Sequence, residues 1–317
     1  MTKLQRAARL VFTQCLGTKQ TESVVIVADA PGMELARLLW ATALRCTRDA
    51  VLVEVPHTHH NGVEPPGSVS RIMAVADVIL LMTSRQLRHS EACRMASRRG
   101  ARILDMSGIT ADALRRTLDV DYGELTLRTR KLADILTIGR KAHLTNPAGT
   151  DAWLSLEGKK GIADTGVVHK HGAFSSMPAG MACVGLMAPG TQGRIVIEHG
   201  FLGCARPDRP VVIDVREGRV AVVRGSKACS PFRQQLRAFG PEARTLAELG
   251  IGTNAAARIT GCLAEDRKVL GTAHVGIGNN RSFGGTVSVP FHVDGILFAP
   301  TLEIDGRVVV QNGQVMV

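Results

Sequence analysis

The stretch Ser23–Cys46, SVVIVADAPGMELARLLWATALRC, decides how the first part of this chain folds. It opens with a continuous apolar run rich in valine and isoleucine, which is typical of a strand buried on both faces. The residues after it repeat apolar side chains at helical spacing, and Pro31 stands near the start, where a helix tolerates proline. The stretch therefore predicts a β-strand followed directly by an α-helix, the unit from which parallel sheets are built.

The same alternation continues along the next hundred residues. Strand-like runs occupy residues 50–56, 75–83 and 101–107, and helical patterns follow the second and third of them. A long helix is predicted over residues 122–141. We therefore expect residues 1–140 to form an α/β domain whose parallel sheet is covered by helices on both faces.

The composition changes near residue 140, because only 8 of the 33 glycines precede residue 141. The second part consists of short strand-like runs bounded by Gly, Pro, Asn and Asp, with a helical pattern in PFRQQLRAFGPEAR. Two of its segments read as β-hairpins with turns at Glu217-Gly218 and Asp305-Gly306. These features predict that residues 141–317 form a second, strand-rich α+β domain.

Composition and charge exclude several classes of protein. The net charge of +11 is spread along the chain, no helix-turn-helix or zinc-finger pattern occurs, and aromatic residues make up only 3%. A nucleic-acid-binding role is therefore not expected. The 7 cysteines form no CxxC pair and indicate reduced thiols in the cytoplasm. Since no apolar run reaches the ~20 residues of a membrane span, we expect no membrane partner and a small-molecule or peptide substrate instead.

Residues 246–298 concentrate acidic and histidine side chains among apolar residues and glycines. His292 and Asp294 are two positions apart in the strand-like segment VPFHVDGI, so both side chains project from the same face. His274, in the strand-like run TAHVGIG, is able to supply a third ligand from a neighbouring strand. Imidazole and carboxylate groups suit a divalent transition metal, although hydrogen-bonded core residues give the same pattern.

A second histidine-rich segment, His57-Thr-His-His60, follows the second predicted strand. Ligands of open α/β sheets bind at the carboxyl ends of the strands, so this loop is a candidate for binding a metal or an anion. A solvated loop is the competing interpretation. Neither glycine-rich phosphate-binding motif, GxGxxG or GxxxxGK[ST], is present, and we predict no nucleotide site.

Over nearly its whole length the chain resembles the aminopeptidase T-like family of metallopeptidases, which are leucyl aminopeptidases. The strongest match is AELGIGTN followed by GCLAEDRKVLGTAHVGIGNNRSFGG and FHVDGI, with supporting matches in GTDAWLSLEGKKGIADTG and SSMPAG. The resemblance implies a homo-oligomeric hydrolase, a dimer or larger, with divalent ions (Zn, Co or Mn) in its second domain. It implies metal ligands at Glu248, His274, His292 and Asp294 and a general base at either Glu265 or Asp266.

One position departs from this family, in which a metal-ligating Glu follows the PAG turn. Here Met181 follows PAG, and a neutral thioether is a poor ligand for such ions. The chain also resembles ring-opening dioxygenases of the 2,5-dihydroxypyridine type. These enzymes bind a single Fe(II), lack the Glu after the turn, and keep the equivalents of His274, His292 and Asp294. They also carry a Ser near the position of Gly276. A hydrolase, an Fe(II) dioxygenase and a repurposed member without peptidase activity are therefore all retained as hypotheses.

Overall fold

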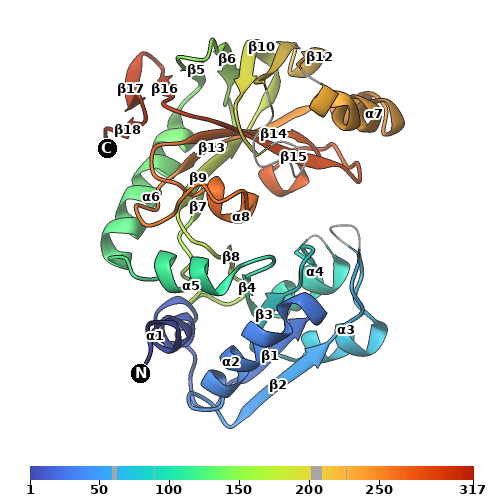
Figure 1. Ribbon diagram of the computed structural model, residues 1–317, viewed down its shortest axis with the longest axis vertical. Coiled ribbons are helices and arrows are strands. Elements are labelled where there is room, and N and C mark those ends of the chain that lie inside the picture. Colours follow the sequence, from blue (N-terminus) through green and yellow to red (C-terminus); the bar gives the residue numbers. More distant parts are fainter. Residues whose placement is uncertain (59–62, 89, 201–208, 226) are drawn as a thin grey trace. The chain divides into compact units, whose positions relative to one another are not determined.

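The computed structural model describes residues 1–58, 63–88, 90–200, 209–225 and 227–317 (Figure 1). The chain folds into two compact units that are not simple halves of the sequence. Unit 1 comprises Met1–Val120 together with Thr165–Ala179, and unit 2 comprises Asp121–Asp164 together with Gly180–Val317. Each unit is described by itself below.

Unit 1 is built on a five-stranded, fully parallel sheet in the order β2-β1-β3-β4-β8. Its central strand β3 is buried at every position, as expected for a strand with both faces covered. The structure thus confirms the predicted parallel sheet and its first four strands. The strands are β1 (Ser23–Ala28), β2 (Asp49–Glu54), β3 (Val78–Met82), β4 (Arg102–Asp105) and β8 (Phe174–Ser176).

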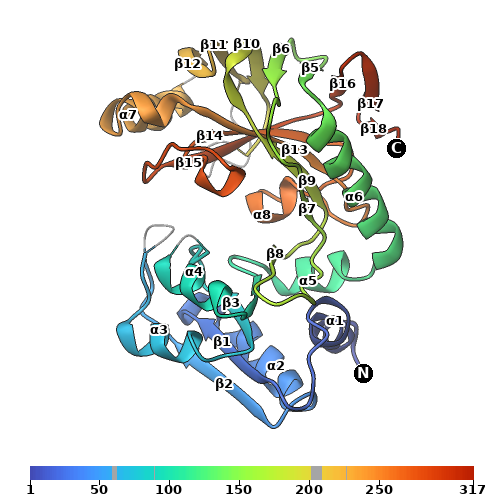
Figure 2. The same ribbon diagram turned by 180° about the vertical axis from the view of Figure 1, so that it is seen from behind.

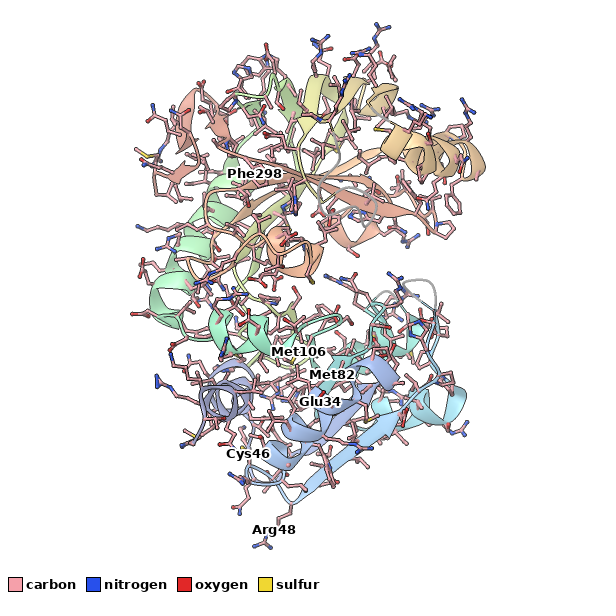
Figure 3. All side chains as sticks on the ribbon, in the orientation of Figure 1. Glu34, Cys46, Arg48, Met82, Met106 and Phe298 are labelled. Atoms are coloured by element: carbon pink, nitrogen blue, oxygen red, sulfur yellow. The ribbon has the colours of Figure 1, made fainter. Side chains whose placement is uncertain are left out.

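Three of the five α-helices described in unit 1 begin at a residue whose side chain caps the helix. Thr2 accepts a hydrogen bond from the backbone of Gln5, and Ser90 and Thr110 accept equivalent bonds at later helices. Met82 and Met106, labelled in Figure 3, are both buried in this unit. The helices are α1 (Lys3–Leu10), α2 (Met33–Ala43), α3 (Gly67–Met73), α4 (Glu91–Arg98) and α5 (Ala111–Thr117).

The division between the units differs from the boundary expected at residue 140. Helix α6 (Tyr122–Ile138) belongs to unit 2, where its apolar face packs on strands β7 (Ile162–Asp164) and β9 (Met181–Gly185) (Figure 2). Leu132 and Leu136 share the core of that unit. The chain then returns to unit 1 and adds β8 to the parallel sheet, a step that the sequence did not indicate.

Unit 2 contains two antiparallel sheets. The larger has the order β12-β11-β10-β6-β5-β16-β17-β18, and the smaller has the order β15-β14-β13-β9-β7. Apolar side chains from strands of both sheets, from α6 and from α7 form one continuous core. The remaining elements are β5 (Lys141–Thr145), β6 (Asp151–Ser155), β10 (Met187–Ile197), β11 (Val211–Arg216), β12 (Arg219–Arg224), α7 (Ser230–Ala238), β13 (Leu246–Gly252), α8 (Leu263–Asp266), β14 (Ala273–Gly278), β15 (His292–Leu297), β16 (Thr301–Ile304), β17 (Arg307–Gln311) and β18 (Gln314–Val315).

Both predicted hairpins are present. Glu217 and Gly218 join β11 to β12 with φ angles of 46° and 69°, and Asp305 and Gly306 join β16 to β17 with φ angles of 49° and 81°. Two successive left-handed residues are the requirement of the tight turn that matches the twist of a hairpin. The strand-rich character predicted for the second part of the chain is therefore confirmed.

Throughout the part of the chain that the structure describes, no helix is both long enough and apolar enough to cross a bilayer.

Candidate metal centre

The candidate ligands share one face of the smaller sheet of unit 2. Glu248 on β13 lies opposite Gly276 on β14, which in turn lies opposite Asp294 on β15. Because side chains alternate along strands, the intervening residues, such as Leu249 and Val275, point to the other face and join the core. We call the first side the polar face, defined by Glu248, His274, His292 and Asp294.

A β-bulge sets the direction of Glu248. Leu246 is paired with Ile277, yet Glu248 is paired with the adjacent Gly276, so Ala247 is an extra residue on β13. In a regular strand without a bulge, Leu246 and Glu248 are two positions apart and would project from the same face. The bulge thus lets Leu246 enter the core while Glu248 turns to the polar face.

Gly276 on β14 makes room for side chains from β13 and β15, the two strands that flank β14. A Cβ atom at this position would lie 2.7 Å from Cγ of Glu248 and 3.0 Å from Cε1 of His292. Both distances are below normal van der Waals contact, so any side chain here would displace a candidate ligand. The absence of a side chain on β14 lets groups from β13 and β15 meet above it.

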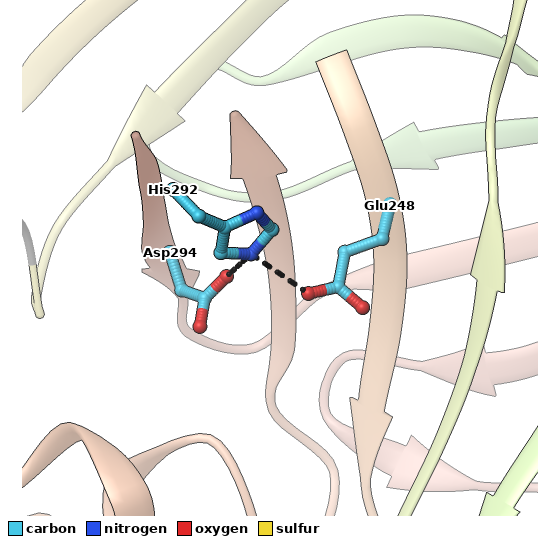
Figure 4. Close-up of side chains that lie close together, drawn as sticks. All are labelled: Glu248, His292 and Asp294. Atoms are coloured by element: carbon cyan, nitrogen blue, oxygen red, sulfur yellow. Dashed lines mark hydrogen bonds and ion pairs between the residues drawn. The ribbon is translucent and has the colours of Figure 1, made fainter. Parts of the chain in front are cut away.

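Three of the predicted ligands converge (Figure 4). One donor atom from each of Glu248, His292 and Asp294 lies within 4.8 Å of the others. Nε2 of His292 is 3.1 Å from Oδ1 of Asp294 and 3.3 Å from Oε1 of Glu248. Two carboxylates and one imidazole nitrogen thus point at a common centre, an arrangement that suits a divalent cation.

His274 lies on the same face but outside that group of three. Its ring is fully buried over Gly250, where a Cβ atom would stand only 2.0 Å from Cε1 of the imidazole. Neither ring nitrogen of His274 has a hydrogen-bond partner among the described residues. The carboxylate oxygens of Glu248 accept no hydrogen bond from them either, and Oε1 has only the ion pair with His292. Buried polar atoms are nearly always satisfied, so these orphaned groups fit ligands of an ion. Burial lowers the pKa of His274, which favours the neutral imidazole that metals bind.

His292 is oriented by a contact on its far side. Its Nδ1 atom lies 2.8 Å from the carbonyl oxygen of Asn279 and donates to it, which leaves Nε2 directed at the two carboxylates. Burial lowers the pKa of His292, but Asp294 and Glu248 outweigh burial and raise that pKa to about 10. In the protein without an ion, a proton on His292 therefore compensates the carboxylates that a metal would otherwise neutralise.

Two buried cations beside the polar face were not identified from the sequence. Nη1 of Arg267 is 2.9 Å from Oδ2 of Asp294, and the ammonium group of Lys268 pairs with Asp164 on β7. All four side chains are at most 10% exposed. The only sequence signal was a basic pair, Arg267-Lys268, directly after the acidic pair Glu265-Asp266 in the family match.

The two predicted general bases, Glu265 and Asp266, are not part of the group of three ligands. Asp266 accepts hydrogen bonds from the backbone of Thr260 and Gly261 and lies 2.7 Å from Nε2 of His199. Glu265 accepts a bond from the backbone of Arg258. Both carboxylates therefore hold the loop that precedes α8, and the contacts do not support a choice of either as a base.

The far end of the polar face carries neutral groups. Met181 on β9 is buried and lies opposite Gly252 on β13 and Asp164 on β7. Cys183 is also buried. Its burial, and to a smaller extent the nearby carboxylate of Glu248, raise the pKa of its thiol, which is therefore uncharged. The carboxylate at this end, Asp164, is already paired with Lys268.

The histidine-rich segment of unit 1 is described only in part. Nδ1 of His57 lies 3.1 Å from Asp29 and 3.0 Å from the hydroxyl of Ser84, so this histidine joins the ends of three neighbouring strands. His59 and His60 lie outside the described residues, and the metal or anion site considered for this loop stays a prediction.

Gly276 provides a test of the geometry. Replacing Gly276 with Ala places a methyl group against Glu248 and His292, and we expect the affinity for Co(II) to fall by at least ~10-fold, as for other disturbances of ligand orientation. Isothermal titration of the protein with Co(II) measures the effect. Gly67→Ala is the control, because the nearest atom to its added Cβ is 3.9 Å away. An unchanged affinity in Gly276→Ala would show that the ion does not bind between β13 and β15.

Comparisons with known proteins point to two kinds of enzyme. The family model described as NicX, 2,5-dihydroxypyridine 5,6-dioxygenase, matches residues 3–317. The solved structure of 2,5-dihydroxypyridine dioxygenase from Pseudomonas putida KT2440 is similar, with a TM-score of 0.87 and 19% identity over 100% of this chain and 98% of that one. Wild-type AmpT from Thermus thermophilus has a TM-score of 0.73 and 15% identity over 99% of both chains. Among curated proteins, none matches this sequence.

Proposed function

Because this chain belongs to the NicX family of 2,5-dihydroxypyridine 5,6-dioxygenases, we propose that it is a mononuclear, iron-dependent dioxygenase. Its substrate would be a small hydroxylated aromatic or heterocyclic compound. The fold alone does not separate this function from that of a metallopeptidase, since structures of both kinds are similar to it. The choice rests on the charges of the polar face.

The observation that carries the proposal is the balance of buried charge. Asp294 is paired with Arg267 and Asp164 with Lys268, so Glu248 is the carboxylate that neither of these cations neutralises. One divalent ion, replacing the proton on His292, leaves a small net charge in this buried region. A second divalent ion would add two further positive charges, and the described carboxylates of the polar face are already paired with Arg267 or needed by the first ion. The second ion would therefore carry a large cost in desolvation and repulsion. The polar face therefore suits one ion.

The residues around that centre have distinct roles in the proposal. Glu248, His274, His292 and Asp294 would hold the ion, and the Asn279 carbonyl keeps Nε2 of His292 directed toward it. A bound Fe(II) would supply the redox chemistry that O2 requires and open positions for small ligands. The glycines at 250 and 276 keep the space beside His274 and Glu248 free of side chains.

The direct test measures oxygen uptake. Anaerobically prepared Fe(II)-loaded protein is mixed with 2,5-dihydroxypyridine and with related hydroxylated pyridines and benzenes. We expect O2 and one of these substrates to disappear in equimolar amounts. Substrate loss without O2 uptake, or no turnover of any of these compounds by Fe(II)-loaded protein, would count against the proposal.

A metal-dependent hydrolase is the second candidate, and Glu248 is the observation that favours it. A second carboxylate beside His292 and Asp294 raises the negative charge of the centre beyond that of a site with two imidazoles and one carboxylate. A bound Zn, Co or Mn ion would activate a water molecule for attack on an amide bond. The test is whether Zn(II)- or Co(II)-loaded protein releases p-nitroaniline from leucyl p-nitroanilide without O2 uptake. Such release would favour the hydrolase over the dioxygenase.

Two expectations from the sequence stay predictions: assembly into a homo-oligomer and a cytoplasmic location. Light scattering of the purified protein gives its molar mass and tests the first of them against the 33.8 kDa of a single chain.

A further inference from the structure

Arg267 is a buried cation that forms an ion pair with Asp294. Its side chain is 10% exposed, and Asp294 is its hydrogen-bond partner among the residues that the structure describes, with Nη1 at 2.9 Å from Oδ2. Its Nε atom is buried and makes no hydrogen bond to the described residues. Burying a guanidinium is costly unless a specific contact repays it, so the contact with Asp294 explains why Arg267 is there.

The two oxygens of Asp294 have different environments. Oδ2 faces the guanidinium, whereas Oδ1 lies 3.1 Å from Nε2 of His292 and faces the centre shared with Glu248. A charge-assisted bond from arginine is among the stronger hydrogen bonds in proteins and restricts rotation of the carboxylate. The arrangement thus separates the oxygen available to an ion from the oxygen held by the protein.

We propose that Arg267 is a positioning residue that keeps Asp294 a one-oxygen ligand and so preserves an open coordination position for a small molecule. The proposal rests on the metal site proposed above. If Oδ2 were free, the carboxylate would be able to turn and offer both oxygens to the ion. Each coordination position filled by the protein is lost to O2 or substrate. Arg267 thereby governs access to the ion without being a ligand itself.

Nitric oxide provides a readout that does not depend on turnover. It is a neutral, O2-like ligand whose complex with Fe(II) has a characteristic paramagnetic resonance signal. Because it is neutral, its affinity reports the open coordination position and does not depend directly on the positive charge that a variant removes. We expect Arg267→Met to bind Fe(II) in the wild-type amount but nitric oxide at least ~10-fold more weakly. Arg267→Lys, which keeps a positive charge and a donor near Oδ2, should recover part of the loss.

The matched control is Arg224→Met, which removes an arginine paired with Asp214 on the larger sheet and should bind nitric oxide as the wild-type protein does. Wild-type nitric oxide affinity in Fe(II)-loaded Arg267→Met would overturn the proposed role of Arg267. Failure of the wild-type protein itself to bind Fe(II) would instead overturn the metal site.

A crystal structure of the Fe(II)-loaded wild-type protein gives a second test that does not require a variant to fold. We expect one oxygen of Asp294 on the ion and the other on Nη1 of Arg267. Two Asp294 oxygens on the ion would contradict the proposal.

Discussion

Replacing His292 with Ala is expected to abolish metal binding and turnover together. The imidazole contributes the nitrogen that faces both Asp294 and Glu248, and no other described side chain in that group of three supplies a nitrogen. Loss of a ligand should weaken Co(II) binding by more than the ~10- to 100-fold seen when a residue that merely supports a ligand is removed. Isothermal titration with Co(II) and assays of oxygen uptake measure the two effects.

The control for this change is His143→Ala. His143 also contacts an aspartate, Asp151, at 2.8 Å in unit 2, but it lies on β5 in the larger sheet. It should retain Co(II) binding and turnover. If His292→Ala and Asp294→Ala both remained active, the catalytic centre would have to lie elsewhere in the chain.

Replacing Lys268 with Met is expected to destabilise unit 2 by about 3–5 kcal/mol, the usual cost of breaking a buried ion pair from one side. The ammonium group is 1% exposed and pairs with Asp164, whose carboxylate would remain buried without it. The chain has 2 tryptophans, Trp40 in unit 1 and Trp153 in unit 2. Urea unfolding of a Trp40→Phe background, followed by fluorescence, therefore reports on unit 2.

Two companion variants interpret that result. Lys268→Met combined with Asp164→Asn removes the stranded charge and should recover much of the lost stability. Arg224→Met breaks a pair with an arginine that is 48% exposed, and exposed pairs contribute about 0–1 kcal/mol. If Lys268→Met and Arg224→Met lowered the free energy of unfolding equally, the Lys268–Asp164 pair would not be a buried pair in solution.

The parallel sheet of unit 1 was predictable because its strands are long apolar runs with helices between them. The position of α6 was not, since an amphipathic helix shows the same pattern whichever sheet it covers. Strand β8 has only 3 residues, Phe174–Ser176, which is too short for a periodic signal. These two features account for the difference between the expected boundary at residue 140 and the observed units.

The candidate site was predictable where local spacing determines it. His292 and Asp294 share a face because they are two apart on a strand, and His274 was suggested by its own strand-like run. The family resemblance supplied Glu248. Arg267 was missed because its partner Asp294 is 27 residues away, and Lys268 because Asp164 is 104 residues away. Such pairs arise from the tertiary fold and leave no periodic pattern.

The acidic pair Glu265-Asp266 illustrates the opposite error. A carboxylate that caps a loop and one that accepts a proton from a substrate look alike in a sequence. The structure gives Asp266 three partners in its own loop and in His199, which favours the first role. Its assignment as a base stays a prediction.

The most direct test of this account is the metal content of each chain. Elemental analysis is made on protein purified without oxygen and then supplied in turn with Fe(II), Zn(II), Co(II) or Mn(II). The balance of charge around Glu248, with Arg267 and Lys268 already buried nearby, predicts one ion per chain. The proposed dioxygenase function predicts that this ion is iron in the active form. Two equivalents of Zn, Co or Mn per chain would contradict the single-ion centre and favour the hydrolase, and no bound metal under any of these conditions would remove the metal site altogether.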